Sequence, residues 1–368
     1  MPPLLLLRTF IECYQKSSYA SISVVMLVGA FFFYFSPEYY FDLYYHYQFY
    51  EYYSLTGNFG DLNNYVGLKW LVVFLNYFYL PKNTLILFTT ISISGSVLII
   101  LNDSFSSLYR KVPNVTIFIL FLFIPWLSIL SGVRFGSAVF LFFLFIYLAE
   151  KNKNYYIFLI IPVCLHFSMI IPAIIVFFTR FNLLFSRKRW FLLSVVLFLL
   201  LSGLFLEKVL VFYLSSMDLS SISNVNGYVT GNESYGSVST LTAGKVIEYL
   251  SIRIVFYIIV AFFILDKGTD FKLYYNRFIL LMIFFISVTI SFATLSGRFI
   301  IPTLIFLFLY NKYFVLIFNG KSKYLIPMFL ILFISAIHFY GFRKHYINNL
   351  DDFFTNYPIN HLVHYLFG

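Results

Sequence analysis

Residues 131–149 read SGVRFGSAVFLFFLFIYLA, a polar break followed by a long apolar run with Arg134 at its start. Residues 296–310 read SGRFIIPTLIFLFLY and place Arg298 directly after another Ser-Gly pair. An arginine at the end of a membrane span is costly unless it faces water, a partner or an anionic ligand. The two strings therefore predict apolar helices in a membrane and two guanidinium groups that bind a doubly anionic group such as a diphosphate.

The composition is that of a membrane protein, since 61% of the 368 residues are hydrophobic and only 11% are charged. Repeated apolar runs of about 17 to 25 residues are typical of transmembrane helices. We expect an all-α, polytopic integral membrane bundle, a single transmembrane domain over 1–368 with about nine to eleven spans plus re-entrant or interfacial helices. The net charge of +10 reflects basic residues in short loops between spans, which set orientation and do not indicate a nucleic-acid partner.

The first apolar run begins near Tyr19 and reads as a span that is retained. The two cysteines, Cys13 and Cys164, match no metal or redox spacing. The clear span candidates are roughly 18–36, 84–101, 114–130, 133–149, 190–213, 246–265, 277–294, 298–318 and 323–341.

Two further apolar stretches, 66–80 and 155–178, are expected not to cross the membrane. Placing the basic loops in the cytoplasm puts 37–83 outside, with 66–80 as an interfacial or re-entrant helix. Residues 155–178 are too few for two crossings, so we expect a hairpin that Pro162 and Pro172 break, with His166 near its tip.

The other outer parts are 131–134, 214–246 and 295–298, and the loop 214–246 is the longest of these three, rich in Ser, Asn, Gly and Thr. A polar loop of this length is a candidate lid or acceptor clamp. The same charge rule leaves the side of the C-terminal tail open, because Arg343 and Lys344 favour the cytoplasm whereas the number of spans places them outside.

Six residues are candidates for the site. Arg134 and Arg298 are either diphosphate ligands or interfacial anchors that extend to the headgroups. Arg253, inside the span 246–265, either joins them or forms an internal ion pair with Glu248.

His166, between two prolines, is a candidate base or hydrogen-bonding group, although a lone apolar-flanked histidine is commonly a structural core residue. Asp42 lies in the tyrosine-rich stretch SPEYYFDLYYHYQFYEYY (36–53), most of which we interpret as an aromatic belt. Asp42 and Glu248 are rival candidates for the base, and no metal-ligand cluster is evident in the sequence.

At these residues the chain resembles the EpsG-like and Wzy-type polysaccharide polymerases. The family pattern is a Gly-Ile/Val-Arg at the start of a span, a basic inner turn and a later Leu/Phe-His motif. Residues 132–172 match it, reading GVRFGSAVFLFFLFIYLAEKNKNYYIFLIIPVCLHFSMIIP. Phe135 stands where EpsG-like members often have glutamine, which favours the Wzy side, and Arg298 corresponds to a late arginine at a span start.

The resemblance implies a membrane glycosyltransferase of the GT-C architecture in the bacterial inner membrane. It would polymerise undecaprenyl-diphosphate-linked repeat units into O-antigen or capsular polysaccharide on the periplasmic face. Its partners would be the lipid-linked donor and acceptor, membrane lipids and a chain-length regulator. We expect neither a cofactor nor a metal. The alternatives are a lipid-linked oligosaccharide flippase, an O-antigen ligase, a membrane O-acyltransferase and a purely structural subunit.

Overall fold

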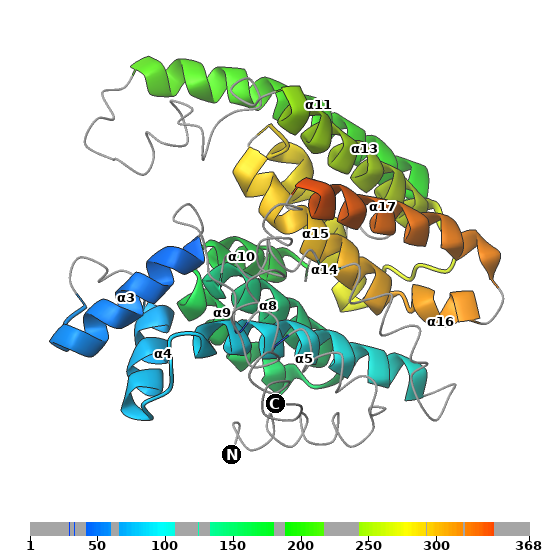
Figure 1. Ribbon diagram of the computed structural model, residues 1–368. Helices are drawn as coiled ribbons and strands as arrows, with labels where there is room; N and C mark the ends of the chain where they lie inside the picture. Colours follow the sequence, from blue (N-terminus) through cyan, green and yellow to red (C-terminus); the bar gives the residue numbers. More distant parts are fainter. Residues whose placement is uncertain are drawn as a thin grey trace, which may run out of the picture. The chain divides into compact units, whose positions relative to one another are not determined.

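A computed structural model describes residues 29, 33, 42–59, 66–106, 124, 133–179, 188–216, 243–291, 293–318 and 321–341. Over these residues the chain is all-helical, with α- and 3₁₀-helices and no strand (Figure 1). This agrees with the expected all-α class. The chain divides into two compact units, Met1–Ile170 with Ser335–Gly368, and Ile171–Ile334.

The first unit is organised around two long helices that pack against each other. Small hydroxyl side chains lie at this interface, where Ser137 donates a hydrogen bond to Thr89 over 3.2 Å. Small residues allow close approach of apolar helices. Its described helices are α3 (Asp42–Thr56), α4 (Val66–Tyr77), α5 (Thr84–Ser106), α8 (Val133–Lys151) and α9 (Ile160–Leu165), with 3₁₀-helices η1 (Lys153–Leu159) and η2 (Phe167–Met169).

The long pair, α5 and α8, supplies the two described helices that are long and apolar enough to cross a membrane, over Thr84–Ser104 and Val133–Lys151. Both were predicted as spans. In contrast, α4 has only 12 residues. At 1.5 Å per residue it is about 18 Å long, which is shorter than the roughly 30 Å hydrocarbon core.

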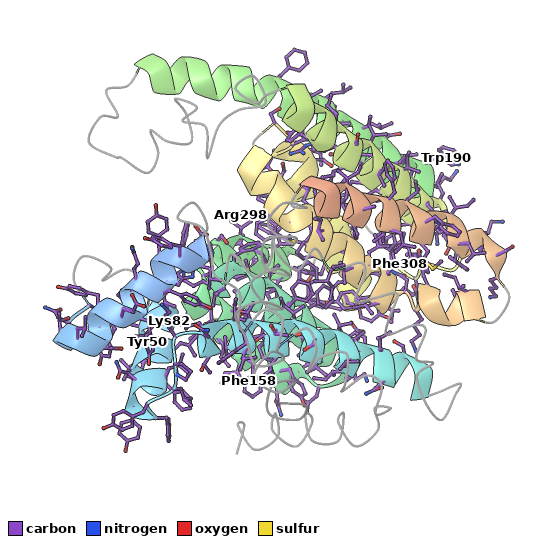
Figure 2. All side chains as sticks on the ribbon, in the orientation of Figure 1. Tyr50, Lys82, Phe158, Trp190, Arg298 and Phe308 are labelled. Atoms are coloured by element: carbon purple, nitrogen blue, oxygen red, sulfur yellow. The ribbon has the colours of Figure 1, made fainter. Side chains whose placement is uncertain are left out.

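Helix α3 forms from a stretch whose many tyrosines obscure its periodicity. Leu43, Tyr47 and Tyr50 are buried at spacings of four and three residues, which places them on one helical face. The Tyr50 hydroxyl donates to the carbonyl of Leu80, and Lys82 forms an ion pair with Glu51 (Figure 2). These contacts fix α3 against the α4–α5 connection.

Helix α4 approaches α9 closely at Gly67. A Cβ at this position would stand 2.6 Å from the carbonyl oxygen of Cys164, so no larger residue fits without a shift of the backbone. The absence of a side chain therefore brings α4 against the segment that leads to His166.

The second unit packs α11 against α13 and α14, and α15 against both α13 and α14. Gly203 of α11 allows a close approach in this unit, as Gly67 does in the first. A Cβ at Gly203 would lie 2.5 Å from the carbonyl oxygen of Ser287. The described elements are α10 (Ile170–Phe178), α11 (Arg189–Ser216), α13 (Ala243–Leu265), α14 (Tyr274–Val288), α15 (Ala293–Tyr310), α16 (Tyr313–Phe318), η4 (Ser322–Tyr324) and α17 (Leu325–Gly341), the last of which continues beyond Ile334.

A polar cluster closes one end of this unit. Arg189 donates to the backbone carbonyls of Ile264, Asp266 and Thr269, and so caps the C-terminus of α13. A cation at this position also interacts favourably with the helix dipole. The buried Asp266 carboxylate accepts from Lys323 over 2.7 Å and from the Tyr324 hydroxyl over 3.1 Å.

The helix boundaries differ from the prediction in the second unit. The predicted span 298–318 is two helices, since α15 ends at Tyr310 and α16 begins at Tyr313. Lys312 between them has a φ of 54°, in the left-handed region that ends helices. The helix α15 also begins earlier, at Ala293, so Arg298 lies inside a helix and not at its first residue. The predicted span 277–294 ends at Val288.

The segment 155–178 is interrupted as expected, but at another residue. Helix α9 ends at Leu165 and His166 itself is extended, with φ −148° and ψ 120°. Pro162 and Pro172 each lie in the first turn of a helix, α9 and α10. Backbone N–H groups have no intrahelical acceptor in a first turn, so a proline there leaves the helix intact.

Candidate functional site

Three residues that are distant in the sequence meet in the first unit: His46 of α3, Arg134 at the start of α8 and His166 in the break after α9. The Nε of Arg134 donates to Nε2 of His46 over 3.0 Å. The His166 ring lies edge-on to the ring of Phe135, the residue after Arg134, with 5.4 Å between the centroids. We call these three residues the His-Arg-His cluster.

His46 is the member that the sequence analysis did not select. Its side chain is only 4% exposed. Burial, followed by the nearby charges of Arg134 and His166, lowers the pKa of His46 from 6.5 to about 3. It is therefore neutral at physiological pH, as an acceptor of the Arg134 N–H must be.

The proton of neutral His46 must then be on Nδ1, because Nε2 accepts the hydrogen bond. Nδ1 is buried and has no hydrogen-bond partner among the described residues. Buried donors are normally paired, so an unpaired N–H here is a position at which a ligand oxygen would be favourable.

His166 is buried and its tautomer is also set by its neighbours. Its Nδ1 accepts from the backbone N–H of Ser168 over 3.2 Å and lies 2.7 Å from the Ser168 hydroxyl. A neutral imidazole that accepts at Nδ1 carries its proton on Nε2. This contact also caps η2, which explains why the chain breaks at this residue.

Asp42 is the first residue of α3 and is exposed. It lies one helical turn before His46 and forms no ion pair within the described residues.

A sequence signal for His46 does exist. If the tyrosines are counted as apolar, the helical spacing places His46 on the same buried face as Leu43, Tyr47 and Tyr50.

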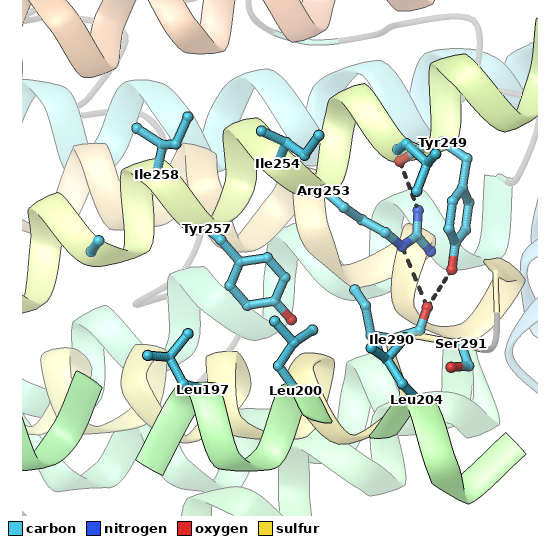
Figure 3. A pocket seen from close by; sticks show the side chains of 12 residues that line it. Leu197, Leu200, Leu204, Tyr249, Arg253, Ile254, Tyr257, Ile258, Ile290 and Ser291 are labelled. Atoms are coloured by element: carbon cyan, nitrogen blue, oxygen red, sulfur yellow. Dashed lines mark hydrogen bonds between the residues drawn. The ribbon is translucent and has the colours of Figure 1, made fainter. Parts of the chain in front are cut away.

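Arg253 organises a second site, in the second unit (Figure 3). Its side chain is buried in α13, and Nη2 donates to the hydroxyl of Ser296 over 2.7 Å. Nε and Nη1 make longer bonds, of 3.4 Å to the carbonyl of Ile290 and 3.3 Å to that of Tyr249. Arg253 thus connects α13 to the turn before α15 and to the Ser-Gly pair of the second string.

A pocket of about 650 Å³ lies beside Arg253, between α11, α13 and the turn after α14. Leu197, Leu200 and Leu204 line its α11 side, and Ile254 and Ile258 extend from Arg253 along α13 (Figure 3). We call it the α11–α13 pocket. It is mostly apolar, with the guanidinium and a few hydroxyl groups as its polar features.

The other predicted site residues are placed as follows. Arg298 is half-buried on α15, in the same unit as Arg253 (Figure 2). Glu248 lies on α13, with its side chain outside the described residues. Most of the predicted 214–246 loop is likewise outside them. Arg134 belongs to the first unit and Arg298 to the second, so their joint binding of a diphosphate stays a prediction.

No group of three or more His, Cys, Asp or Glu residues at metal-ligand spacing occurs in the described part of the chain. Comparisons with known proteins give no family: no family model, no curated protein and no solved structure matches the chain. Any functional assignment therefore depends on the sequence and the geometry.

Proposed function

We propose that this protein is a polytopic membrane glycosyltransferase that polymerises undecaprenyl-diphosphate-linked oligosaccharide repeat units into O-antigen or capsular polysaccharide. Two span-length apolar helices support the membrane placement. Further support comes from large apolar side chains on α11 and α13 that are about half exposed or more, Phe198 at 68% and Ile254 at 60% among them. Contiguous exposed apolar side chains mark a membrane or interaction surface.

The observation that carries the proposed chemistry is the hydrogen bond from Arg134 to His46. The partner of Nε is a neutral imidazole, so this contact fixes the plane of the guanidinium without cancelling its charge. A fixed, positively charged, planar group suits bidentate binding of phosphate oxygens. The Nδ1–H of His46 and the Nε2–H of His166 are two further donors in the same cluster.

In the proposed reaction, a hydroxyl of the acceptor repeat unit attacks the anomeric carbon of the donor glycan. A new C–O glycosidic bond forms, the bond between the anomeric carbon and the diphosphate oxygen breaks, and undecaprenyl diphosphate leaves with the bonding electrons. Negative charge grows on the diphosphate in the transition state, where Arg134 and Arg298 stabilise it. Binding energy spent there lowers the barrier without a metal.

The tautomer of His166 favours the hydrogen-bonding role over the role of base. With Nδ1 occupied by Ser168, the remaining ring nitrogen carries a proton and donates to a sugar or phosphate oxygen. The proton released by the attacking hydroxyl then passes to a carboxylate. Asp42, one turn from His46, is our candidate, with Glu248 as the alternative. A diphosphate is already a good leaving group, so positioning contributes more than proton removal.

The proposal includes the architecture and location that the resemblance implies. These are a GT-C-like bundle of about nine to eleven spans in the bacterial inner membrane, with its site facing the periplasm, residues 214–246 as a lid or acceptor clamp, and a chain-length regulator as partner.

The test is incubation of purified full-length protein with synthetic undecaprenyl-diphosphate repeat units, with products separated on a gel. We expect a ladder of chain lengths that persists with a chelator. Arg134→Gln and Arg298→Gln should abolish the ladder, whereas Arg134→Lys should restore it only in part, because an ammonium cannot form the planar fork. Lys153→Gln, a charge removed from an exposed position, is the matched control and should leave the ladder unchanged.

The rival functions give different products. A flippase moves single repeat units across vesicles without joining them, and a ligase makes product only when lipid A core is supplied. Normal ladders in both arginine variants would remove the diphosphate assignment.

A further inference from the structure

The α11–α13 pocket is a cavity that the proposed reaction does not use. Its volume of about 650 Å³ lies within the range typical of small-molecule sites, roughly 300–1,000 Å³. Its rim is open, since Leu197, Leu204, Ile254 and Ile258 are each between 48% and 60% exposed. In a membrane this rim faces hydrocarbon, so the pocket is accessible to a lipid chain from the side.

Arg253 places a buried positive charge beside the pocket. It is 6% exposed, and no described carboxylate forms an ion pair with it. The guanidinium lies over the face of the Tyr249 ring, a cation–π contact. Its three described hydrogen-bond acceptors are uncharged oxygens, two of them at 3.3 and 3.4 Å, and they take up three of the five guanidinium N–H groups. A buried cation is stabilised by an anion that accepts its remaining N–H groups, because desolvation of an unpaired charge is costly.

The apolar part of the pocket extends along α13 beyond Arg253. From Arg253 to Ala261, which also lines the pocket, is eight residues of helix, or about 12 Å at 1.5 Å per residue. The residues after Arg253 read IVFYIIVAFFIL (254–265), without a charge. A phosphate at Arg253 would therefore have its acyl chain alongside Ile254, Ile258 and Ala261.

We propose that the α11–α13 pocket binds one anionic membrane phospholipid, with its phosphate on Arg253 and an acyl chain along α11 and α13. The bound lipid would hold Arg253 against Ser296 and so stabilise the start of α15, the helix that carries Arg298. The inference depends on the membrane placement in the proposed function but not on the glycosyl transfer, and it assigns Arg253 to a lipid other than the substrate.

The experiment measures lipid retention. Delipidated full-length protein in detergent is mixed with phosphatidylglycerol or phosphatidylcholine, and bound lipids are counted by native mass spectrometry. We expect one retained lipid with at least a tenfold preference for phosphatidylglycerol. Arg253→Gln should lose the preference, and Arg253→Lys should keep part of it because the charge remains.

Two tryptophan variants of α11 are the matched pair that separates filling of the pocket from a general change of the apolar surface. Leu200 lines the pocket and Leu201, the next residue, does not. Leu200→Trp should abolish retention of either lipid, whereas Leu201→Trp should behave as wild type. Elution volume and circular dichroism verify that each variant is folded.

Three results would overturn the inference: equal retention in the two tryptophan variants, a lipid preference that is unchanged in Arg253→Gln, or displacement of the phospholipid by equimolar undecaprenyl phosphate, which would assign the pocket to the substrate. The polymerisation ladder is a separate readout. If the wild-type protein retains the lipid but produces no ladder, the result counts against the proposed glycosyltransferase activity and not against the lipid site.

Discussion

Arg134 donates its Nε–H to Nε2 of His46 across 3.0 Å, and this bond joins residues 88 positions apart in the chain. An uncharged base, and not a carboxylate, thus orients the guanidinium through Nε. Such a contact suits the binding of an anion, because it orients the guanidinium without neutralising its positive charge.

The first prediction concerns this orienting contact. His46→Ala should lower kcat for polymerisation by about 10- to 100-fold with a smaller change in KM, because misplacement of a catalytic group by about 1 Å has effects of this size. His46→Gln retains a carbonyl acceptor and should recover part of the loss. The measurement is steady-state kinetics on the lipid-linked repeat unit. Equal losses in both variants would contradict a positioning role and indicate a purely structural one.

The second prediction is a pH dependence of stability. His46 has a pKa of about 3 when folded and 6.5 ordinarily, so between these values the unfolded chain binds a proton that the folded chain rejects. The contribution of neutral His46 to the free energy of unfolding is complete above pH 6.5 and declines as the pH falls towards 3. Between pH 7.5 and 5.5 the loss should be about 1.4 kcal/mol.

Thermal unfolding in detergent at the two pH values measures this loss, and His46→Gln is the control, because it lacks the titrating group. The variant should show a smaller decrease in Tm on acidification than wild type. A decrease of the same size in both proteins would contradict the assignment of this titration to His46.

The third prediction compares two glycines. Gly203→Ala places a Cβ 2.5 Å from the carbonyl oxygen of Ser287 and should destabilise the protein by about 1–3 kcal/mol through overpacking of α11 against α14. At Gly297 a Cβ meets nothing within 4 Å, so Gly297→Ala should be neutral or should stabilise α15 by up to about 1 kcal/mol.

The polymerisation activity of Gly297→Ala shows whether this glycine is needed for ligand binding. If a ligand approaches the backbone beside Arg298, Gly297→Ala reduces polymerisation despite its equal or higher Tm. Unchanged activity would mean that this glycine has no part in binding. Denaturant unfolding and the polymerisation ladder, measured on the same preparation, give both results.

The fourth prediction concerns the polar cluster at the end of α13. Asp266 is 7% exposed and accepts from both Lys323 and Tyr324, so Asp266→Ala should cost about 1–3 kcal/mol by leaving the buried Tyr324 hydroxyl without this acceptor. Lys323→Met should cost less, because the Lys323 side chain is 54% exposed and solvent screens its ion pair. A comparison of the two Tm values tests the order, and a larger effect of Lys323→Met would contradict it.

Apolar runs alone predicted the positions of the two longest described helices of the first unit. The stretches 84–101 and 133–149 are helices α5 and α8, because a long apolar run without turn residues has few alternatives to a helix. The interruption near His166 was also predictable, although the residue at which it occurs was not: the prolines are tolerated in first turns, and the break is made by a side-chain hydrogen bond from Ser168 to His166.

The sequence by itself determined the all-helical class and was sufficient to select Arg134 and His166 as candidate site residues, since a charge or an imidazole in an apolar environment is costly wherever the chain folds. Only the tertiary structure decided that His46 joins them, that Arg253 bonds to Ser296 and that α11 and α13 enclose a pocket. These contacts connect residues 43 and more positions apart, and such pairings depend on how helix faces pack. No local pattern of residues encodes that packing.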